Sequence, residues 1–379
     1  MALWYHKMND YILNTSSCIF MGLLGGDNIM PTQVIDLFCG IGGLTRGLLD
    51  AGLNVIAGFD NDPTCEFAYH ENNHADFICQ NIREMTGADV QEHFAPNAIK
   101  ILVGCAPCQP FSTMRFKLKS ANLTDEKYNL LTEFGRIIQA VQPSVVSMEN
   151  VPQIQETQIY NAFYELLQRM GYHVSTQVVF CPDYGISQTR RRFVLLASLF
   201  GDITLIPPTH ARNDVTLATV IQNLPALKAG DVDPNDPLHR ASNLSETNLK
   251  RIKASIPGGT WRDWPENLRC ACHQKESGKT YSSVYGRLSW DQIGPTITTQ
   301  FYCYGTGRHG HPEQDRALSL REGALLQSFP PTYNFIDPDR DFSFRDIARH
   351  IGNAVPVRLG EIIGESIINH LALYGIDIN

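Results

Sequence analysis

The sequence lacks the features that mark secreted and membrane proteins. It shows no clear secretory signal, and the apolar patch at residues 18–26 is too short to span a bilayer and has no basic leader. Its ten cysteines are scattered, without the spacing of a disulfide framework. It also has no internal repeat and no low-complexity segment. We therefore expect reduced thiols, a cytoplasmic protein and no membrane partner.

Positive charge is scarce over the chain as a whole. The 31 Lys and Arg residues are outnumbered by 39 Asp and Glu residues, and the net charge of −8 argues weakly against a nucleic-acid partner. The balance reverses between residues 238 and 279, which hold eight basic and four acidic residues. A phosphate-contacting surface and an ordinary charged face explain this segment equally well on charge alone.

The remaining composition is that of an ordinary folded protein, with 43% hydrophobic and 18% charged residues. A chain of 379 residues is long enough for two unequal domains. Residues 1–29 carry no periodic pattern, and strong patterning begins after Met30. We interpret residues 1–29 as a poorly ordered N-terminal extension, or as the product of a start codon placed too early.

Apolar runs and helical patterns alternate along residues 30–204. The runs predict strands at 32–38, 54–60, 98–105, 144–150, 173–180 and 191–200. Apolar residues at helical spacing predict helices near 44–52, 130–141 and 160–170. This alternation is typical of a parallel α/β sheet with helices on both faces.

The alternation of strands and helices ends at about residue 207. Pro, Gly, Asn, Trp and charged residues dominate as far as about residue 285, which indicates a smaller, loop-rich domain within residues 205–342. An amphipathic helix is expected at 357–375, and it should pack back onto the first domain. The first domain would then comprise residues 30–204 plus 343–379.

A glycine-rich turn follows the first predicted strand. A strand, a glycine turn and a helix suit a nucleotide pocket, because backbone N–H groups and the helix N-terminus face the ligand. Thr45 stands where the dinucleotide fingerprint has its third glycine, and Asp60 ends the second strand, where a carboxylate can accept both ribose hydroxyls. The turn fits an adenosyl ligand as well as a dinucleotide, and a plain tight turn explains it nearly as well.

The stretch GCAPCQPFS (104–112) contains Cys105 and Cys108 in C-x-x-C spacing. Such a pair occurs in redox dithiols and in zinc sites, and a zinc site would need two further ligands. The segment RCACH (269–273) could offer them from Cys270, Cys272 and His273. A third interpretation makes Cys108 a nucleophile, with its neighbour incidental. Only this interpretation uses the Gln-Pro-Phe-Ser that follows, and it needs no metal.

Six blocks of the sequence together resemble the bacterial-type DNA (cytosine-5)-methyltransferases. The blocks are DLFCGIGGLTRGL (36–48), GCAPCQPFS (104–112), MENVPQ (148–153), QTRRRFVLLA (188–197), RLSWDQIGPTITT (287–299) and GNAVPV (352–357). One block would be weak evidence, but six in the family's order, over nearly the whole length from Val34 onward, are highly specific. The resemblance implies a Rossmann-like, S-adenosylmethionine-dependent methyltransferase sheet with a smaller target-recognition domain. It implies methyl transfer from S-adenosylmethionine to carbon 5 of cytosine within a specific DNA sequence.

The resemblance also implies that Cys108 is the catalytic thiol and that Cys105 is a bystander. A thiolate that adds to carbon 6 of cytosine makes carbon 5 able to attack a sulfonium methyl group. A carboxyl group must then hydrogen-bond N3 and the exocyclic amine, and Glu149 in MEN suits that role. By the same resemblance, Arg190 and Arg192 orient the thiol and bind the base carbonyl.

The resemblance assigns Asp60 to the ribose of the cofactor and Asn353 to its methionine end. Asn81 stands where the family usually has an Asp that contacts the adenine amine. An amide oxygen can still accept that hydrogen bond, although without charge. The other residues implied in cofactor binding are Phe38, Gly40, Gly42, Gly43 and Pro107.

A cytosine inside a duplex cannot reach a thiol, so the target base must be flipped out. The resemblance places a loop that closes over DNA after Cys108, and it places target recognition in residues 205–285. The DNA-binding candidates are Gln109, Ser112, Arg115 and Lys117 in the loop, and Arg262 and Arg269 in the recognition region. We expect a monomer that binds double-stranded DNA, and a restriction endonuclease that cuts the same site is a candidate partner.

Three alternatives remain open on the sequence. A cytosine-5 methyltransferase acting on tRNA would use the same catalytic set, although the length of the variable region and the absence of a Cys-Phe-Thr tripeptide count against it. A C-x-x-C thiol oxidoreductase would need Cys105. A binding-only descendant would be expected to have lost Cys108 or Glu149, and neither is lost.

Overall fold

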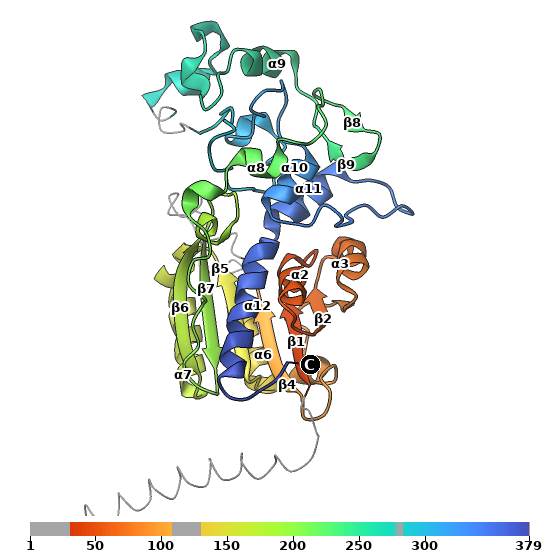
Figure 1. Cartoon of the computed structure of the whole chain (residues 1–379), viewed down its shortest axis with the longest axis vertical. Helices are drawn as coiled ribbons and strands as arrows, with labels where there is room; N and C mark the ends of the chain where they lie inside the picture. The colour runs from red at the N-terminus through yellow and green to blue at the C-terminus, as the bar shows by residue number, and fades with distance from the viewer. Residues whose placement is uncertain (1–30, 108–129, 277, 279–282, 379) are drawn as a thin grey trace, which may run out of the picture.

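The computed structural model describes residues 31–107, 130–276, 278 and 283–378 (Figure 1). The predicted N-terminal extension, Cys108 and the loop that follows Cys108 lie outside these residues. Within the described ranges, no helix is both long and apolar enough to cross a membrane.

A seven-stranded sheet with the order β3-β2-β1-β4-β5-β7-β6 forms the centre of the larger part of the molecule. Its strands are β1 (Thr32–Leu37), β2 (Val55–Asp60), β3 (Asp76–Cys79), β4 (Ile99–Gly104), β5 (Val145–Asn150), β6 (His173–Phe180) and β7 (Arg191–Ser198). Neighbours among β1 to β5 pair in parallel, whereas β7 is antiparallel to both β5 and β6. The prediction of a parallel sheet is confirmed for six strands, since β1 to β6 all run in one direction. It is wrong at β7, because the short connection 181–190 turns the chain back beside β6.

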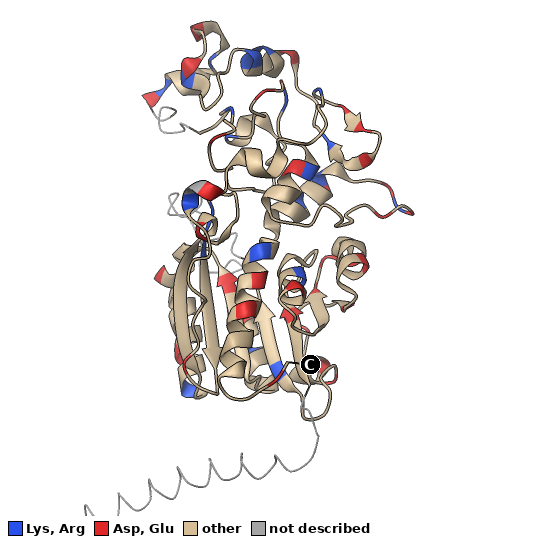
Figure 2. Ribbon diagram, in the orientation of Figure 1, with Lys and Arg blue, Asp and Glu red and all other residues tan. Residues whose placement is uncertain are grey.

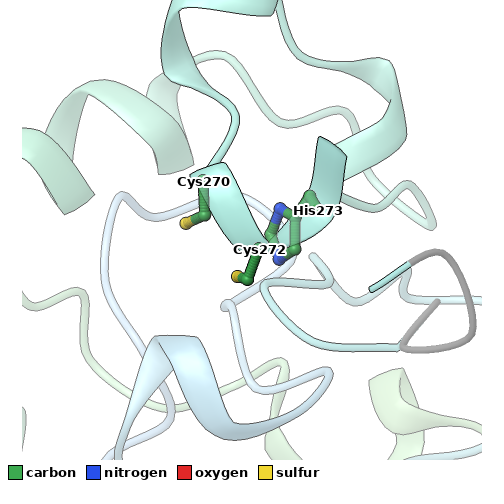
Figure 3. A group of neighbouring side chains, drawn as sticks. All are labelled: Cys270, Cys272 and His273. Carbon is green, nitrogen blue, oxygen red and sulfur yellow. The ribbon is translucent and has the colours of Figure 1, made fainter. Parts of the chain in front are cut away.

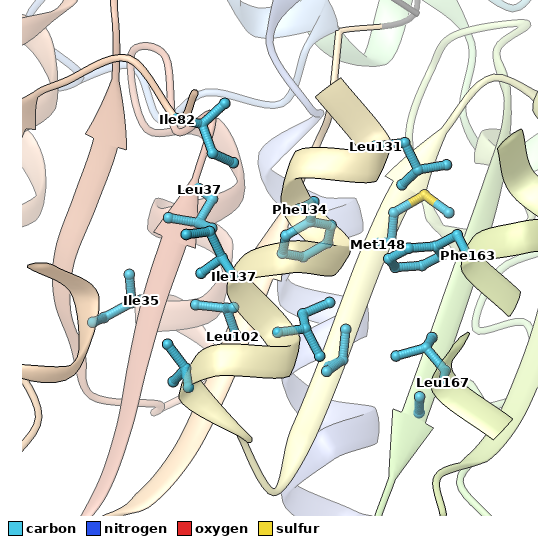
Figure 4. Packing of buried hydrophobic residues seen from close by; sticks show 14 of the residues in the cluster. Ile35, Leu37, Ile82, Leu102, Leu131, Phe134, Ile137, Met148, Phe163 and Leu167 are labelled. Atoms are coloured by element: carbon cyan, nitrogen blue, oxygen red, sulfur yellow. The ribbon is translucent and has the colours of Figure 1, made fainter. Parts of the chain in front are cut away.

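Helices cover both faces of the sheet, as the alternation of elements predicts. One face carries α6 (Leu130–Val141) and α7 (Gln158–Arg169), with α4 (Gly87–Gln91) beside α6. The other face carries α2 (Gly43–Asp50) and α12 (Val357–Ala372) (Figure 1). Alternate residues of β1 enter the two cores. Ile35 and Leu37 pack under α6, where Figure 4 shows Leu37 near Phe134, and Val34 packs under α12.

The C-terminal helix α12 packs back onto the first part of the chain, which confirms the expected return. Glycines permit its close approach to α2. A Cβ atom at Gly47 would lie 2.1 Å from the carbonyl oxygen of Val357, and one at Gly360 would lie 2.8 Å from that of Leu44. Larger residues at these two glycines would therefore push α2 and α12 apart.

The residues between the sheet and α12 form a loop-rich region (Figure 1). Its elements are α8 (Leu217–Ile221), β8 (Val232–Asp233), β9 (Asp236–Arg240), α9 (Glu246–Lys253), α10 (Leu320–Leu326) and α11 (Phe344–Asn353). The predicted loop-rich character is present, but one buried cluster joins residues of this region to Ile41, Cys65 and Ala68 near the sheet. Division into domains at residues 205 and 343 stays a prediction.

Candidate active site

A cavity of about 540 Å³ opens at the carboxyl ends of β1 and β2, a position where α/β sheets bind ligands. Its volume is in the range of small-molecule sites. Six residues predicted to bind the cofactor line it, and they come from five separate segments: Phe38, Gly40, Asp60, Asn81, Pro107 and Asn353. The structure thus brings together most of the cofactor set that the sequence suggests.

The glycine turn is tied to the end of β2 through Asp60. The backbone N–H of Gly40 donates to Asp60 Oδ2 at 2.9 Å, and that of Asp62 donates to Oδ1 at 3.0 Å. Burial raises the pKa of Asp60, and these two N–H groups partly offset the effect. Gly40 has φ +51, and no atom lies within 4 Å of its Cβ position, so the backbone there borders open space.

Phe38 enters the cavity from an unusual backbone conformation. Its φ of 64° lies in the left-handed region, which is strained for a residue with a side chain. The ring packs edge-on against Phe134 of α6, with 6.4 Å between ring centroids. The strained turn therefore brings an aromatic ring from the end of β1 to the wall of the cavity.

Gly42 and Gly43 do not belong to the cavity lining, unlike the other predicted cofactor residues. A Cβ atom at Gly42 would lie 2.3 Å from Asn73 Nδ2, and one at Gly43 would lie 2.3 Å from the carbonyl oxygen of Val355. These glycines are needed here for close packing at the start of α2. Their direct contact with the cofactor stays a prediction.

Asp36 is a cavity residue that the sequence reasoning missed. It is 1% exposed, and its Oδ2 accepts a hydrogen bond from Thr45 Oγ1 at 2.8 Å. Its Oδ1 is buried and has no hydrogen-bond partner among the described residues. Burial raises the pKa of Asp36 to about 7. A carboxylate inside the apolar run VIDLF was the available signal, because an unpaired buried acid is costly without a function.

Asp62, Arg349 and His350 form a second unpredicted group on the cavity wall. Arg349 Nη1 lies 2.7 Å from Asp62 Oδ2, and His350 Nε2 lies 3.4 Å from the same oxygen. Although burial raises the pKa of Asp62, hydrogen bonds from Thr64 and Arg349 leave it well below its usual range. This group joins the loop after β2 to α11, the helix that carries Asn353.

Glu149 is buried at the carboxyl end of β5, with 2% of its surface exposed. Arg192 Nε lies 2.8 Å from Glu149 Oε1, and the Cys105 thiol donates to Oε2 at 2.8 Å. The sheet register explains the ion pair: Glu149 is opposite Val194 on β7, and Arg192 lies two residues further on the same face. Asn150 Nδ2 donates to the carbonyl of Ala106 at 3.1 Å, which holds the Cys105 turn beside Glu149.

The predicted partner Arg190 lies elsewhere. It is buried, and its guanidinium donates to the carbonyl oxygens of Ile297 at 3.1 Å and Ala354 at 3.5 Å. These bonds join the start of β7 to the loop-rich region and to the segment before α12. Both of these hydrogen bonds are to backbone carbonyl oxygens. The role of Arg190 in orienting the thiol stays a prediction.

The DNA-binding candidates are only partly described. Gln109, Ser112, Arg115 and Lys117 lie outside the described residues, as does Cys108. Arg262 is exposed, with its guanidinium 5.6 Å from the ring centroid of Trp261. Arg269 donates to the carbonyl oxygens of Trp264 at 3.2 Å and Arg262 at 2.8 Å. Acidic and basic residues are interspersed over the loop-rich region that contains these arginines (Figure 2).

Comparison with known families agrees with this arrangement. The family model described as C-5 cytosine-specific DNA methylase matches residues 32–369. The chain belongs to the C-5 cytosine-specific DNA methylases. This match covers the sheet, the cavity, Glu149 and the return of α12.

Curated relatives and solved structures resemble this methyltransferase along nearly all of its length. The type II methylase M.HgiDII of Herpetosiphon aurantiacus is 52% identical over 342 residues, covering 89% of this chain and 95% of the relative. The type II methyltransferase M1.BsuMI of Bacillus subtilis is 31% identical, covering 87% of this chain and 79% of the relative. The Entamoeba histolytica methyltransferase EhMeth shares the fold, with a TM-score of 0.61 at 16% identity, over 90% of this chain and 99% of the other.

The protein is therefore a DNA (cytosine-5)-methyltransferase, and it is similar to type II methylases from bacteria. This assignment confirms the resemblance carried by the six sequence blocks. It leaves the thiol oxidoreductase interpretation without support. The Cys105 thiol, which that interpretation needs, is hydrogen-bonded to Glu149. The family is one of DNA methylases, which disfavours the tRNA alternative.

Proposed function

We propose that this methyltransferase acts on cytosine within a specific sequence of duplex DNA, through a covalent bond from Cys108 to carbon 6 of a flipped-out base. One observation carries the proposal. The buried Glu149 is fixed by Arg192 and touches Cys105, which also lines the cavity and stands three residues before Cys108. Three parts of the proposed site therefore lie together at the carboxyl end of the sheet. They are the carboxyl group for the base, the ligand cavity and the start of the segment that carries Cys108.

S-adenosylmethionine fits the cavity in size and chemistry. Asp60 would accept the ribose hydroxyls, Asn81 would accept the adenine amine, and Asn353 would lie at the methionine end. The unpartnered Oδ1 of Asp36 is a further acceptor, suited to the cationic groups of the ligand. When bound, this cofactor supplies an electrophilic methyl group on sulfur.

Cys108, Glu149 and Arg192 would have different roles in the reaction of the base. The Cys108 thiolate adds to carbon 6, and the carboxyl group of Glu149 hydrogen-bonds N3 and the exocyclic amine. Arg192 holds Glu149 in place at 2.8 Å, so its orientation does not have to be established during the reaction. Burial at the end of β5 keeps competing water from the carboxyl group.

Recognition of the target would lie in residues 205–285, since the catalytic groups meet the same base and cofactor at every site. Arg262 and Arg269 are the candidates there, and Gln109, Ser112, Arg115 and Lys117 are the candidates in the loop after Cys108. We expect a monomer in the cytoplasm, with a catalytic domain of residues 30–204 plus 343–379 and a recognition domain of residues 205–342. A restriction endonuclease of the same specificity is a candidate partner.

A trapping experiment tests the covalent mechanism. Sequencing of bisulfite-treated DNA from cells that express the protein first gives the target motif. A duplex with 5-fluorocytosine at that target cannot lose a proton from carbon 5, so the adduct should persist and migrate as a protein–DNA complex. Peptide mapping should place the adduct on Cys108, whereas an adduct on any other cysteine would overturn the assignment.

A further inference from the structure

Three potential metal ligands lie together in the loop-rich region, away from the cavity. Cys270, Cys272 and His273 come from the short turn at Ala271–Gln274 and its preceding residue. One ligand atom from each lies within 4.8 Å of the other two (Figure 3). Neither cysteine forms a disulfide bond within the described residues, and Cys272 is exposed.

The histidine of this group is held in a fixed position. His273 is 4% exposed, and its ring stacks on Trp261 with 4.2 Å between centroids and 21° between planes. Its Nδ1 is buried and has no hydrogen-bond partner within the described part of the chain. A buried imidazole nitrogen without a partner is costly unless something binds it, and a metal ion is one group that can.

We propose that Cys270, Cys272 and His273 bind a thiophilic divalent cation, with zinc as the physiological ion. Zinc prefers thiolate and imidazole ligands at about 2.3 and 2.0 Å, which places tetrahedral ligand atoms about 3.5–3.8 Å apart. The three ligand atoms lie within 4.8 Å of one another, so their side chains would have to rotate to reach that range when the ion binds. The group has three members among the described residues, so water would take a fourth position. The site differs from the zinc interpretation of the sequence, since it does not involve Cys105.

One side chain beside the group supports a ligand from outside. The hydroxyl of Tyr285 is hydrogen-bonded with Cys270, which would orient that sulfur from outside the metal shell.

The position of the group gives the ion a structural role. The surrounding part of the chain has a small core whose fully buried members are Ile252, Trp261, Trp264, Tyr304 and Ala317. Loop-rich units with small cores commonly need a metal or a disulfide for stability. The ion would fix the turn at 270–273 against Trp261 and Tyr285. It would thereby fix Arg269, whose side chain bonds to the carbonyl oxygen of Arg262.

The test uses the full-length protein without DNA or S-adenosylmethionine, so its outcome does not depend on the proposed catalytic chemistry. Elemental analysis after purification should find zinc equimolar with protein. Replacement by Co²⁺ should give a thiolate-to-metal charge-transfer band and the visible bands of a four-coordinate ion. Zinc titration of the apoprotein should also change tryptophan fluorescence, because the His273 ring stacks on Trp261.

Matched variants locate the ion. C270S and C272S should each lose the equimolar zinc and the charge-transfer band, whereas C303S, which removes a half-buried thiol of the same region, should keep both. Y285F should weaken zinc binding by about tenfold, as expected for loss of a group that orients a ligand. Circular dichroism and a cooperative thermal unfolding transition should show that each variant is folded.

Three results would overturn the proposal. They are a wild-type protein without equimolar zinc or a cobalt–thiolate band, a zinc content that C270S and C272S leave unchanged, and a Cys270–Cys272 disulfide in the protein purified under reducing conditions.

Discussion

The thiol of Cys105 donates a hydrogen bond to Oε2 of Glu149 at 2.8 Å. The neighbour of the proposed nucleophile therefore touches the carboxyl group proposed to bind the base. The contact is local, because Asn150 holds the turn at Ala106 against the end of β5. Cys105 is thus part of the wall of the site, although the proposed mechanism gives it no bond to the substrate.

Because of this contact, we expect serine substitutions of Cys105 and Cys108 to have different effects on activity. C108S should abolish methyl transfer, because a hydroxyl group is a far weaker nucleophile than a thiolate. C105S should keep most of the activity, since a hydroxyl can replace the thiol as donor to Glu149. Incorporation of radiolabelled methyl groups into target duplexes measures both. Equal loss in the two variants would instead favour a mechanism that needs a dithiol.

Glu149→Gln should lower kcat by about 10²–10³-fold, the usual cost of removing one electrostatic stabiliser. The amide keeps the shape of the side chain but loses the charge that pairs with Arg192. Binding of cofactor and of DNA should be retained, as measured by calorimetry and by gel shift. Near-wild-type turnover in this variant would show that Glu149 has a structural role only.

The strands and long helices of the sheet were predictable because their apolar residues are numerous and regularly spaced. β3 was missed, since it has only four residues, of which the first is Asp76. The direction of β7 was wrong because periodicity carries no information on strand direction. Sheet order and the return of α12 to α2 depend on contacts between residues far apart in the chain.

The residues of the candidate site that belong to a sequence motif were predictable. Residues whose role depends on tertiary packing were less so. Asp60 and Asn353 line one cavity, as the motifs suggest. Gly42 and Gly43 instead pack against Asn73 and Val355, an arrangement that depends on tertiary contacts. Asp36 was missed for a similar reason, because burial rather than residue type makes it unusual.

Asp36 should make the stability of the ligand-free protein depend on pH. Burial raises its pKa from 3.8 to about 7, so the folded protein binds more protons than the unfolded chain between these values. Protonation of Asp36 therefore stabilises the folded protein relative to the unfolded chain. This contribution to the free energy of unfolding is fully present below pH 3.8 and is lost as the pH rises to about 7. Urea titrations should show the free energy of unfolding falling across this window, relative to D36N, by at most about 4 kcal/mol.

Asn is the matched replacement for Asp36, because its amide oxygen can still accept the hydrogen bond from Thr45. If Asp36 binds a cationic group of S-adenosylmethionine, saturation with the cofactor should reduce the pH-dependent difference between the two proteins. D36N should also bind the cofactor more weakly at pH 8 than the wild type does. Identical pH profiles of stability in the two proteins would show that Asp36 is not buried as a titrating carboxyl group.

The two arginines of the recognition region should behave differently, because Arg262 is exposed, whereas Arg269 is half-buried and its guanidinium donates to backbone carbonyl oxygens. Arg269 donates to the carbonyl oxygens of Trp264 and Arg262, so R269A should destabilise the loop-rich region as well as weaken DNA binding. Arg262 is exposed on the same segment, and R262A should leave the unfolding transition nearly unchanged. Its effect should be on DNA alone.

The effect of R262A on DNA binding should show whether Arg262 contacts a base or a phosphate group. If it reads a guanine edge, R262A should relax one position of the methylated motif, at a cost of about 1–3 kcal/mol in discrimination. If it contacts phosphate, binding should weaken evenly across sequences, and the dependence on salt concentration should become shallower by about one ion. K253A, which removes an exposed charge from α9, is the control for a general loss of positive charge. Equal affinity, motif and salt dependence in R262A and the wild type would place recognition away from Arg262.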